Sequence, residues 1–224
     1  MARVVVFILG FLLLAVCDEN AFIAAGNDAT TKYRPDERRS MVSPLLARNA
    51  AASDTANKRG WYFDFPTALG SVHYVVAGVN IAASSSVDAS ISVTTTARPV
   101  FVYNLQSDNT CIYPAHVRLL LQEMRDDLSG RNGKQYFRWW STSVAYQLAS
   151  GRADLSASLS DLSQWVSVFG EKANASAGAT AGFKQAMANL GNVGFAFGGG
   201  CFYGHGVRLT GGSARFAVAN YTAR

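Results

Sequence analysis

Short runs of alternating apolar and polar residues follow one another from residue 61 to the C-terminus. In 87–96, Val, Ala and Ile alternate with Asp, Ser and Thr, which is the period-2 pattern of a half-buried β-strand. In 117–124, a strand would place Val117, Leu119 and Leu121 on one face and Arg118 on the other. Comparable runs predict further strands over 61–65, 71–79, 99–105, 135–140, 193–197 and 213–221.

One segment has the helical period instead. Phe183, Met187 and Leu190 are spaced i, i+4, i+7, so they line one face of a helix predicted over 179–190. A second short helix is expected around 42–52. Many short strands with one or two surface helices predict an all-β fold, a two-sheet jelly-roll β-sandwich, over residues 60–224.

The start of the chain has the pattern of an export signal. One arginine precedes an apolar run over 4–16, which is shorter than the roughly 20 residues of a membrane-spanning helix. Residues 1–17 are therefore expected to be a signal peptide or a lipoprotein signal, with an uncleaved anchor as the alternative. The protein would then be secreted, periplasmic or envelope-anchored, and would meet a membrane only through this segment.

The end of that segment, Leu-Ala-Val-Cys at 14–17, resembles the lipobox of bacterial lipoproteins. Val16 stands where Gly or Ala is usual, so lipidation at Cys17 and plain cleavage both remain open. Residues 18–59 lack a clear period, contain Pro35 and Pro44, and are expected to form a flexible linker.

Composition narrows the classes of function. Hydrophobic residues make up 49% of the chain and charged residues 16%, which excludes a disordered protein. The net charge of +5 is modest and spread along the chain, so we expect no nucleic-acid partner. Neither a nucleophile elbow (G-x-S-x-G) nor a zinc-protease motif (H-E-x-x-H) occurs, and no catalytic or metal-ligating residues are assigned. No cofactor is expected. Asp126 and Asp127 predict a solvated turn, with a calcium site as the alternative interpretation.

The segment 135–140 predicts a ligand-binding surface. In a strand, Tyr136, Arg138 and Trp140 share one face, and the arginine suggests that this face meets solvent. Aromatic rings stack on the C–H faces of sugars while a guanidinium donates to their hydroxyls. The alternative is a surface cation–π stack without a ligand.

Two further binding candidates, Tyr203 and His205, lie in the glycine-rich stretch 198–206. Glycine lets a ligand approach the backbone closely, but the stretch also suits a purely structural connection. No Lys-Ser/Thr pair follows it, so it is not a phosphate-binding loop.

The cysteines agree with an exported protein. Once Cys17 is removed or lipidated, Cys111 and Cys201 remain as an even pair in an oxidising compartment. A disulfide that joins two loops is expected, with two free thiols as the alternative.

The last third of the chain resembles galactose-binding-like jelly rolls. The resemblance rests on a late helix that leads into the strand 192–197, a glycine loop, and a closing strand at 214–218. Segments 136–141, 165–170 and 197–207 also resemble uncharacterised secreted bacterial proteins. The resemblance implies a carbohydrate-binding module whose partner is a carbohydrate or a cell-envelope polysaccharide.

We therefore expect an exported, non-catalytic module that binds carbohydrate through its aromatic and arginine side chains. Two alternatives stay open: an extracellular polysaccharide hydrolase or lyase, and a structural envelope protein without a small ligand. The observation that helps to discriminate among these three functions is whether the side chains of the aromatic strand are exposed to a ligand or buried.

Overall fold

The computed structural model describes residues 41–42, 48–49, 61–67, 71–77, 84–103, 114–200 and 203–223. These residues form strands, one α-helix and one 3-10 helix, which confirms the prediction of an all-β fold. Cys17, Cys111 and Cys201 lie outside them, as does the expected signal at 1–17. The predicted lipidation and disulfide therefore stay predictions.

Most of the secondary-structure elements are β-strands. The strands are β1 (Met41–Val42), β2 (Arg48–Asn49), β3 (Trp61–Asp64), β4 (Tyr74–Ala77), β5 (Ser86–Thr96), β6 (Val100–Tyr103), β7 (His116–Glu123), β8 (Arg138–Gln147), β9 (Gly151–Ser158), β10 (Trp165–Ser167), β11 (Leu190–Gly198), β12 (Val207–Thr210) and β13 (Ser213–Ala223). The helices are η1 (Leu162–Gln164), which is 3-10, and α3 (Ala177–Ala188).

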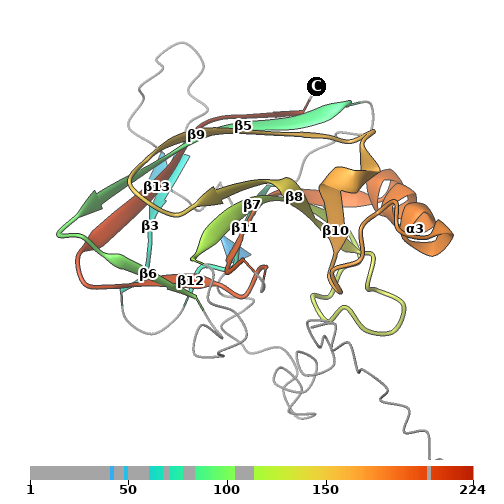
Figure 1. Ribbon diagram of the computed structural model, residues 1–224, viewed down its shortest axis with the longest axis horizontal. Helices are drawn as coiled ribbons and strands as arrows, with labels where there is room; N and C mark the ends of the chain where they lie inside the picture. Colours follow the sequence, from blue (N-terminus) through green and yellow to red (C-terminus); the bar gives the residue numbers. More distant parts are fainter. Residues whose placement is uncertain are drawn as a thin grey trace, which may run out of the picture. The chain divides into compact units, whose positions relative to one another are not determined.

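These strands form two large sheets and one small one. Sheet A has the order β1-β4-β11-β7-β8-β10, sheet B has the order β2-β3-β13-β5-β9, and β12 pairs with β6 in the small sheet. Among the described strands, β1 and β4 pair in parallel, and the other pairings are antiparallel. In Figure 1, β5 and β9 of sheet B lie over β7 and β8 of sheet A.

An aromatic core joins the two sheets. The ring of Phe216 on β13 lies 5.4 Å from that of Phe195 and 5.2 Å from that of Phe197, both on β11. The rings meet edge to face, which is a favoured geometry for aromatic pairs. Phe195 and Phe197 are two residues apart, so the pleat of β11 points both toward sheet B.

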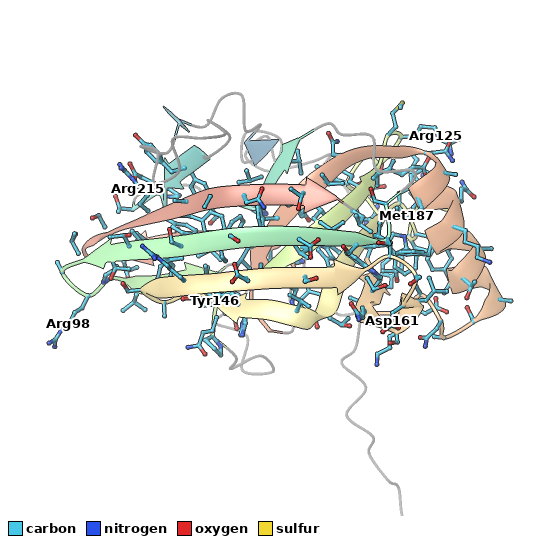
Figure 2. The ribbon with its side chains drawn as sticks, turned by 90° about the horizontal axis from the view of Figure 1, so that it is seen from above. Arg98, Arg125, Tyr146, Asp161, Met187 and Arg215 are labelled. Atoms are coloured by element: carbon cyan, nitrogen blue, oxygen red, sulfur yellow. The ribbon has the colours of Figure 1, made fainter. Side chains whose placement is uncertain are left out.

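The outer face of sheet B is made mostly of small polar side chains. On β5, Val87, Ala89, Ile91 and Val93 are buried, while the Ser, Asp and Thr residues between them stay half-buried or exposed. The predicted period-2 pattern is therefore confirmed for this strand. Figure 2 looks onto this face, where β13, β5 and β9 run side by side. Hydroxyl groups alternate there with charged side chains such as Asp88 and Asp154, which accept hydrogen bonds from Ser156 and Ser90.

Much of sheet A is buried on both faces, although Ala145 and Gln147 near the end of β8 are exposed. On β7, every residue from Val117 to Glu123 is buried, so the strand has no solvent side. Its inner face belongs to the aromatic core, and its outer face belongs to a second apolar cluster that contains Tyr74, Val76, Leu120, Trp140, Val166 and Ala196. Leu128, Val168 and Tyr203 pack onto this second cluster from the loops beyond the strands.

Helix α3 lies beside β10 at one end of the sheets (Figure 1). Its first turn is capped by Ser176, whose hydroxyl accepts a hydrogen bond from the amide of Ala179 at 3.0 Å. Phe183 anchors the helix against Trp139 in the core, with ring centroids 5.2 Å apart. In the described part of the chain, neither helix is long and apolar enough to cross a membrane.

The structure corrects several predicted boundaries. The helix begins at Ala177 and ends at Ala188, because the serine cap precedes the apolar pattern and Leu190 already belongs to β11. The second helix expected around 42–52 is wrong where the range is described, since Val42 ends β1 and 48–49 form β2.

Strand β9 was not predicted from the pattern. Leu155 and Ala157 are its buried residues, and small or polar residues surround them, so its apolar signal is weak. Strand β8 begins at Arg138 instead of residue 135 and runs on to Gln147, because residues 134–137 form a turn closed by the hydrogen bond from the Phe137 amide to the Lys134 carbonyl.

The aromatic core yields a direct test of the fold. We expect Phe216→Ala to lower the free energy of unfolding by about 3–5 kcal/mol, because it removes the ring that contacts both phenylalanines of β11. Chemical denaturation followed by circular dichroism measures this. The control is Ser92→Ala on the outer face of sheet B, which should change the value by less than about 0.5 kcal/mol. Equal effects of the two substitutions would contradict this packing.

Candidate functional site

The outer face of sheet A gathers three of the five predicted binding residues. Arg138 and Trp140 come from β8, and Tyr203 comes from the glycine-rich loop. Tyr74 on β4 and Arg118 on β7 join them. We call these five residues the outer cluster.

Strand pairing explains why these residues meet. β7 pairs with β8 so that Leu120 lies opposite Trp140. Arg118 and Leu120 are two residues apart on β7, and Arg138 and Trp140 are two apart on β8, so each pair shares one face of its strand. Within the cluster, the rings of Trp140 and Tyr203 meet edge to face with centroids 6.0 Å apart.

The expectation that this face of β8 meets solvent is wrong. Arg138 and Trp140 each keep only 4% of their surface exposed. The reason is the loop between β7 and β8, which folds back over the outer face and places Leu128 and Asp126 against it. An arginine in a strand predicts a solvent-exposed face only if no other part of the chain supplies a counter-charge that allows the arginine to be buried.

Arg138 is neutralised almost completely by protein groups. Its Nε lies 2.9 Å from the Asp126 carboxylate, whose side chain is fully buried. Nη1 donates to the Tyr74 hydroxyl at 2.9 Å, and Nη2 donates to the Leu128 carbonyl at 2.5 Å. One ion pair and two hydrogen bonds thus hold the guanidinium, and these contacts fasten the loop to the sheet.

Tyr136 does not belong to the outer cluster. It precedes β8, so the alternation of the strand does not reach it, and its ring stacks on Trp139 at 5.7 Å with an interplanar angle of 11°. Its hydroxyl donates to Glu171 at 2.6 Å, and this bond raises the pKa of Tyr136. An added Cβ at Gly182 would meet its ring at 2.5 Å, so Tyr136 packs closely against α3.

The glycine-rich loop is fastened to the outer face by its backbone. His73, which is buried, donates from Nδ1 to the Gly204 carbonyl at 3.0 Å. Gly204 has a φ of +71°, and a Cβ there would collide with the Tyr74 ring, so glycine is required at this position. Tyr203 and His205 on either side are half-buried. The loop therefore brings Tyr203 to the outer cluster, and His205 follows it two residues later.

Arg118 was not singled out as a site residue from the sequence, which placed it only on the face of the strand opposite Val117 and Leu119. Its guanidinium carbon lies 4.1 Å from the centre of the Tyr203 ring, in a cation–π contact. Nη1 donates to the backbone carbonyls of Ser141 at 2.9 Å and Thr142 at 3.2 Å. Among the described residues, no carboxylate lies within ion-pair distance of it.

Burial has an electrostatic consequence for Arg118. Only 8% of its surface is exposed, and desolvation lowers the pKa of its guanidinium, while the nearby Tyr203 acts in the opposite direction. Desolvation also lowers the pKa of His116 on the same strand; its bond to the Pro114 carbonyl opposes this, and the charge of Arg118 lowers it further. His116 is therefore mostly neutral at pH 7, and Arg118 remains charged.

The two carboxylates considered for calcium, in the turn after β7, form ion pairs and hydrogen bonds with protein groups instead. Asp126 pairs with Arg138, and Asp127 accepts from Lys134 at 2.7 Å and from Ser129. Partial burial acts to raise the pKa of Asp127, but the bonds from Lys134 and Ser129 outweigh it and lower the pKa to about 2. Over the described residues, no group of His, Cys, Asp and Glu side chains is arranged to hold a metal ion.

The buried ion pair makes the outer cluster testable. We expect Arg138→Met to lower the free energy of unfolding by about 3–5 kcal/mol, because it leaves the Asp126 carboxylate buried without its cation. Adding Asp126→Asn should recover part of the loss. Urea denaturation of the single and double variants measures both effects. Arg215→Met is the control, since the Arg215–Asp64 pair is solvent-exposed and its loss should leave the midpoint nearly unchanged. A similarly small effect of Arg138→Met would contradict the role given to this pair.

Comparison of the chain with protein families, with curated proteins and with solved structures found no match.

Proposed function

We propose that the protein is an exported, non-catalytic jelly-roll module that binds carbohydrate at the edge of the outer cluster. The observation that carries this proposal is the grouping of a half-buried aromatic ring, Tyr203, with the guanidinium of Arg118. The ligand would be a polysaccharide of a cell envelope or of the environment.

The chemistry of this edge suits a sugar. The part of the Tyr203 ring that is not buried offers an apolar surface for the C–H face of a pyranose. Arg118 adds hydrogen-bond donors beside the ring, and the neighbouring His205 lies in the same turn. Arg138 and Trp140, which the sequence placed in direct contact with a ligand, support this edge from below, since both are buried.

The contacts that hold Tyr203 and Arg118 in place also support a binding role. Tyr203 sits in a loop held by His73 and Gly204, and Arg118 sits on a central strand of sheet A. A preformed site limits the loss of conformational entropy on binding, which favours affinity for flexible sugar chains.

The finer features of the proposal have their support in the sequence. The succession of α3, β11, the glycine-rich loop and the closing strand β13 has the order that suggested a galactose-binding-like jelly roll. The apolar run at 4–16 supports export.

A glycan array, probed with the full chain, tests the proposal. We expect binding to at least one polysaccharide class and a loss of about tenfold in affinity for Tyr203→Ala, since the lost ring contact is worth roughly 1.4 kcal/mol. The matched control is Tyr62→Ala, because Tyr62 is also half-buried and also has an arginine, Arg215, over its ring at 3.9 Å.

Two results would contradict the proposal. A folded wild-type protein that retains no glycan would exclude carbohydrate binding. Equal losses for the Tyr203 and Tyr62 variants would show that the edge of the outer cluster is not where the sugar binds.

A further inference from the structure

One edge of the Arg118 guanidinium is unused. Both of its hydrogen bonds leave from Nη1, and they go to the carbonyls of Ser141 and Thr142. Nε is enclosed and has no hydrogen-bond partner. Nη2 likewise has no partner among the described residues, but it is not one of the enclosed atoms. Within the described part of the chain, the edge formed by Nε and Nη2 therefore has no acceptor, and Nη2 is its accessible end.

This edge is the one that binds carboxylates side-on. Arg215 shows the arrangement in the same molecule, with Nε 2.7 Å from one oxygen of Asp64 and Nη2 2.9 Å from the other. Such paired bonds match the planar shape and charge of a carboxylate. Arg118 presents the same edge without an acidic partner among the described residues.

The charge balance of the outer face points to an anion. The charge of Arg138 is cancelled by Asp126, while His116 is mostly neutral at pH 7. Arg118, which is nearly buried, therefore has no counter-ion among the described residues, and a buried charge without one is unfavourable. An anionic ligand would supply that counter-ion.

A second free donor lies against the same aromatic ring. The indole Nε1 of Trp140 is enclosed and has no hydrogen-bond partner, and Trp140 contacts Tyr203 edge to face. Arg118 contacts the face of that ring. Unsatisfied donors are rare in buried positions, so two beside one ring mark a place where an acceptor is missing.

We infer that Arg118 binds the carboxylate of an acidic sugar, so that the ligand of the module is a uronate-containing polysaccharide. This inference rests on the proposed function and adds the chemical class of the ligand. Tyr203 would contact the sugar ring, and Nη2 of Arg118, which is not enclosed, would hold the carboxylate beside it; a second bond from the enclosed Nε requires the side chain to shift toward the ligand.

Isothermal titration calorimetry of the full chain at constant ionic strength tests the inference. The probes are oligogalacturonate, neutral galactan oligomers of equal length, and polyglutamate. We expect the wild type to bind oligogalacturonate roughly tenfold or more tightly than the neutral oligomers, and Arg118→Gln to remove this preference. Arg215→Gln is the matched control and should keep the preference, because that arginine already holds Asp64.

Arg118→Lys separates charge from geometry. A lysine keeps the positive charge but cannot form the paired bonds, so we expect it to lose most of the preference while remaining folded in circular dichroism. If Arg118→Gln fails to fold, the lysine variant alone decides the role of the guanidinium edge. A lysine variant with the full preference of the wild type would overturn that role.

The remaining outcomes are distinguishable. Equal binding of acidic and neutral oligomers, unchanged by Arg118→Gln, would overturn the inference and leave the proposed carbohydrate binding intact. No binding of any glycan by the folded wild type would overturn both. Binding of polyglutamate as tightly as of oligogalacturonate would overturn the assignment to a sugar and indicate an acidic protein partner.

Discussion

The outer face of sheet A depends on one buried ion pair. The loop between β7 and β8 can cover this face only if the Arg138 guanidinium loses its water, and Asp126, which comes from that loop, provides the compensating charge at 2.9 Å. The hydrogen bonds to Tyr74 and Leu128 complete the coordination of the arginine. Because the loop supplies both the counter-ion and the cover, much of the sheet is buried on both sides while sheet B keeps a polar outer face.

The same face holds two arginines that differ in whether a carboxylate of the described residues pairs with them. Arg138 forms an ion pair with Asp126 and donates a hydrogen bond from each Nη atom, so it stabilises the fold. Nη1 of Arg118 donates to two backbone carbonyls. Its Nε and Nη2, beside Tyr203, have no partner among the described residues. The difference distinguishes a structural cation from one suited to a ligand, and it places the proposed site at the boundary between the covered and the accessible parts of the outer cluster.

Local patterns predicted most of the strands, because the alternation on β5 and the apolar residues of β11 report directly on burial. They did not predict which face of β8 is covered, since that depends on Asp126, twelve residues earlier along the chain. Tyr136 was assigned to the wrong group because it lies in the turn at 134–137, and β8 begins only after that turn. Arg118 was placed on the correct face, but only the structure shows that its side chain lacks an acidic partner among the described residues.

The outer face of sheet A thus holds one arginine that is paired with a carboxylate, Arg138, and one that has no acidic partner among the described residues, Arg118. NMR of the arginine Nε–H groups tests this difference most directly, because each side-on carboxylate contact shifts the signal of the arginine that makes it. On titration with oligogalacturonate, the account predicts a shift of the Arg118 signal and unchanged signals for Arg138 and Arg215. Binding that leaves the Arg118 signal in place, or that shifts the two paired arginines instead, would contradict the account.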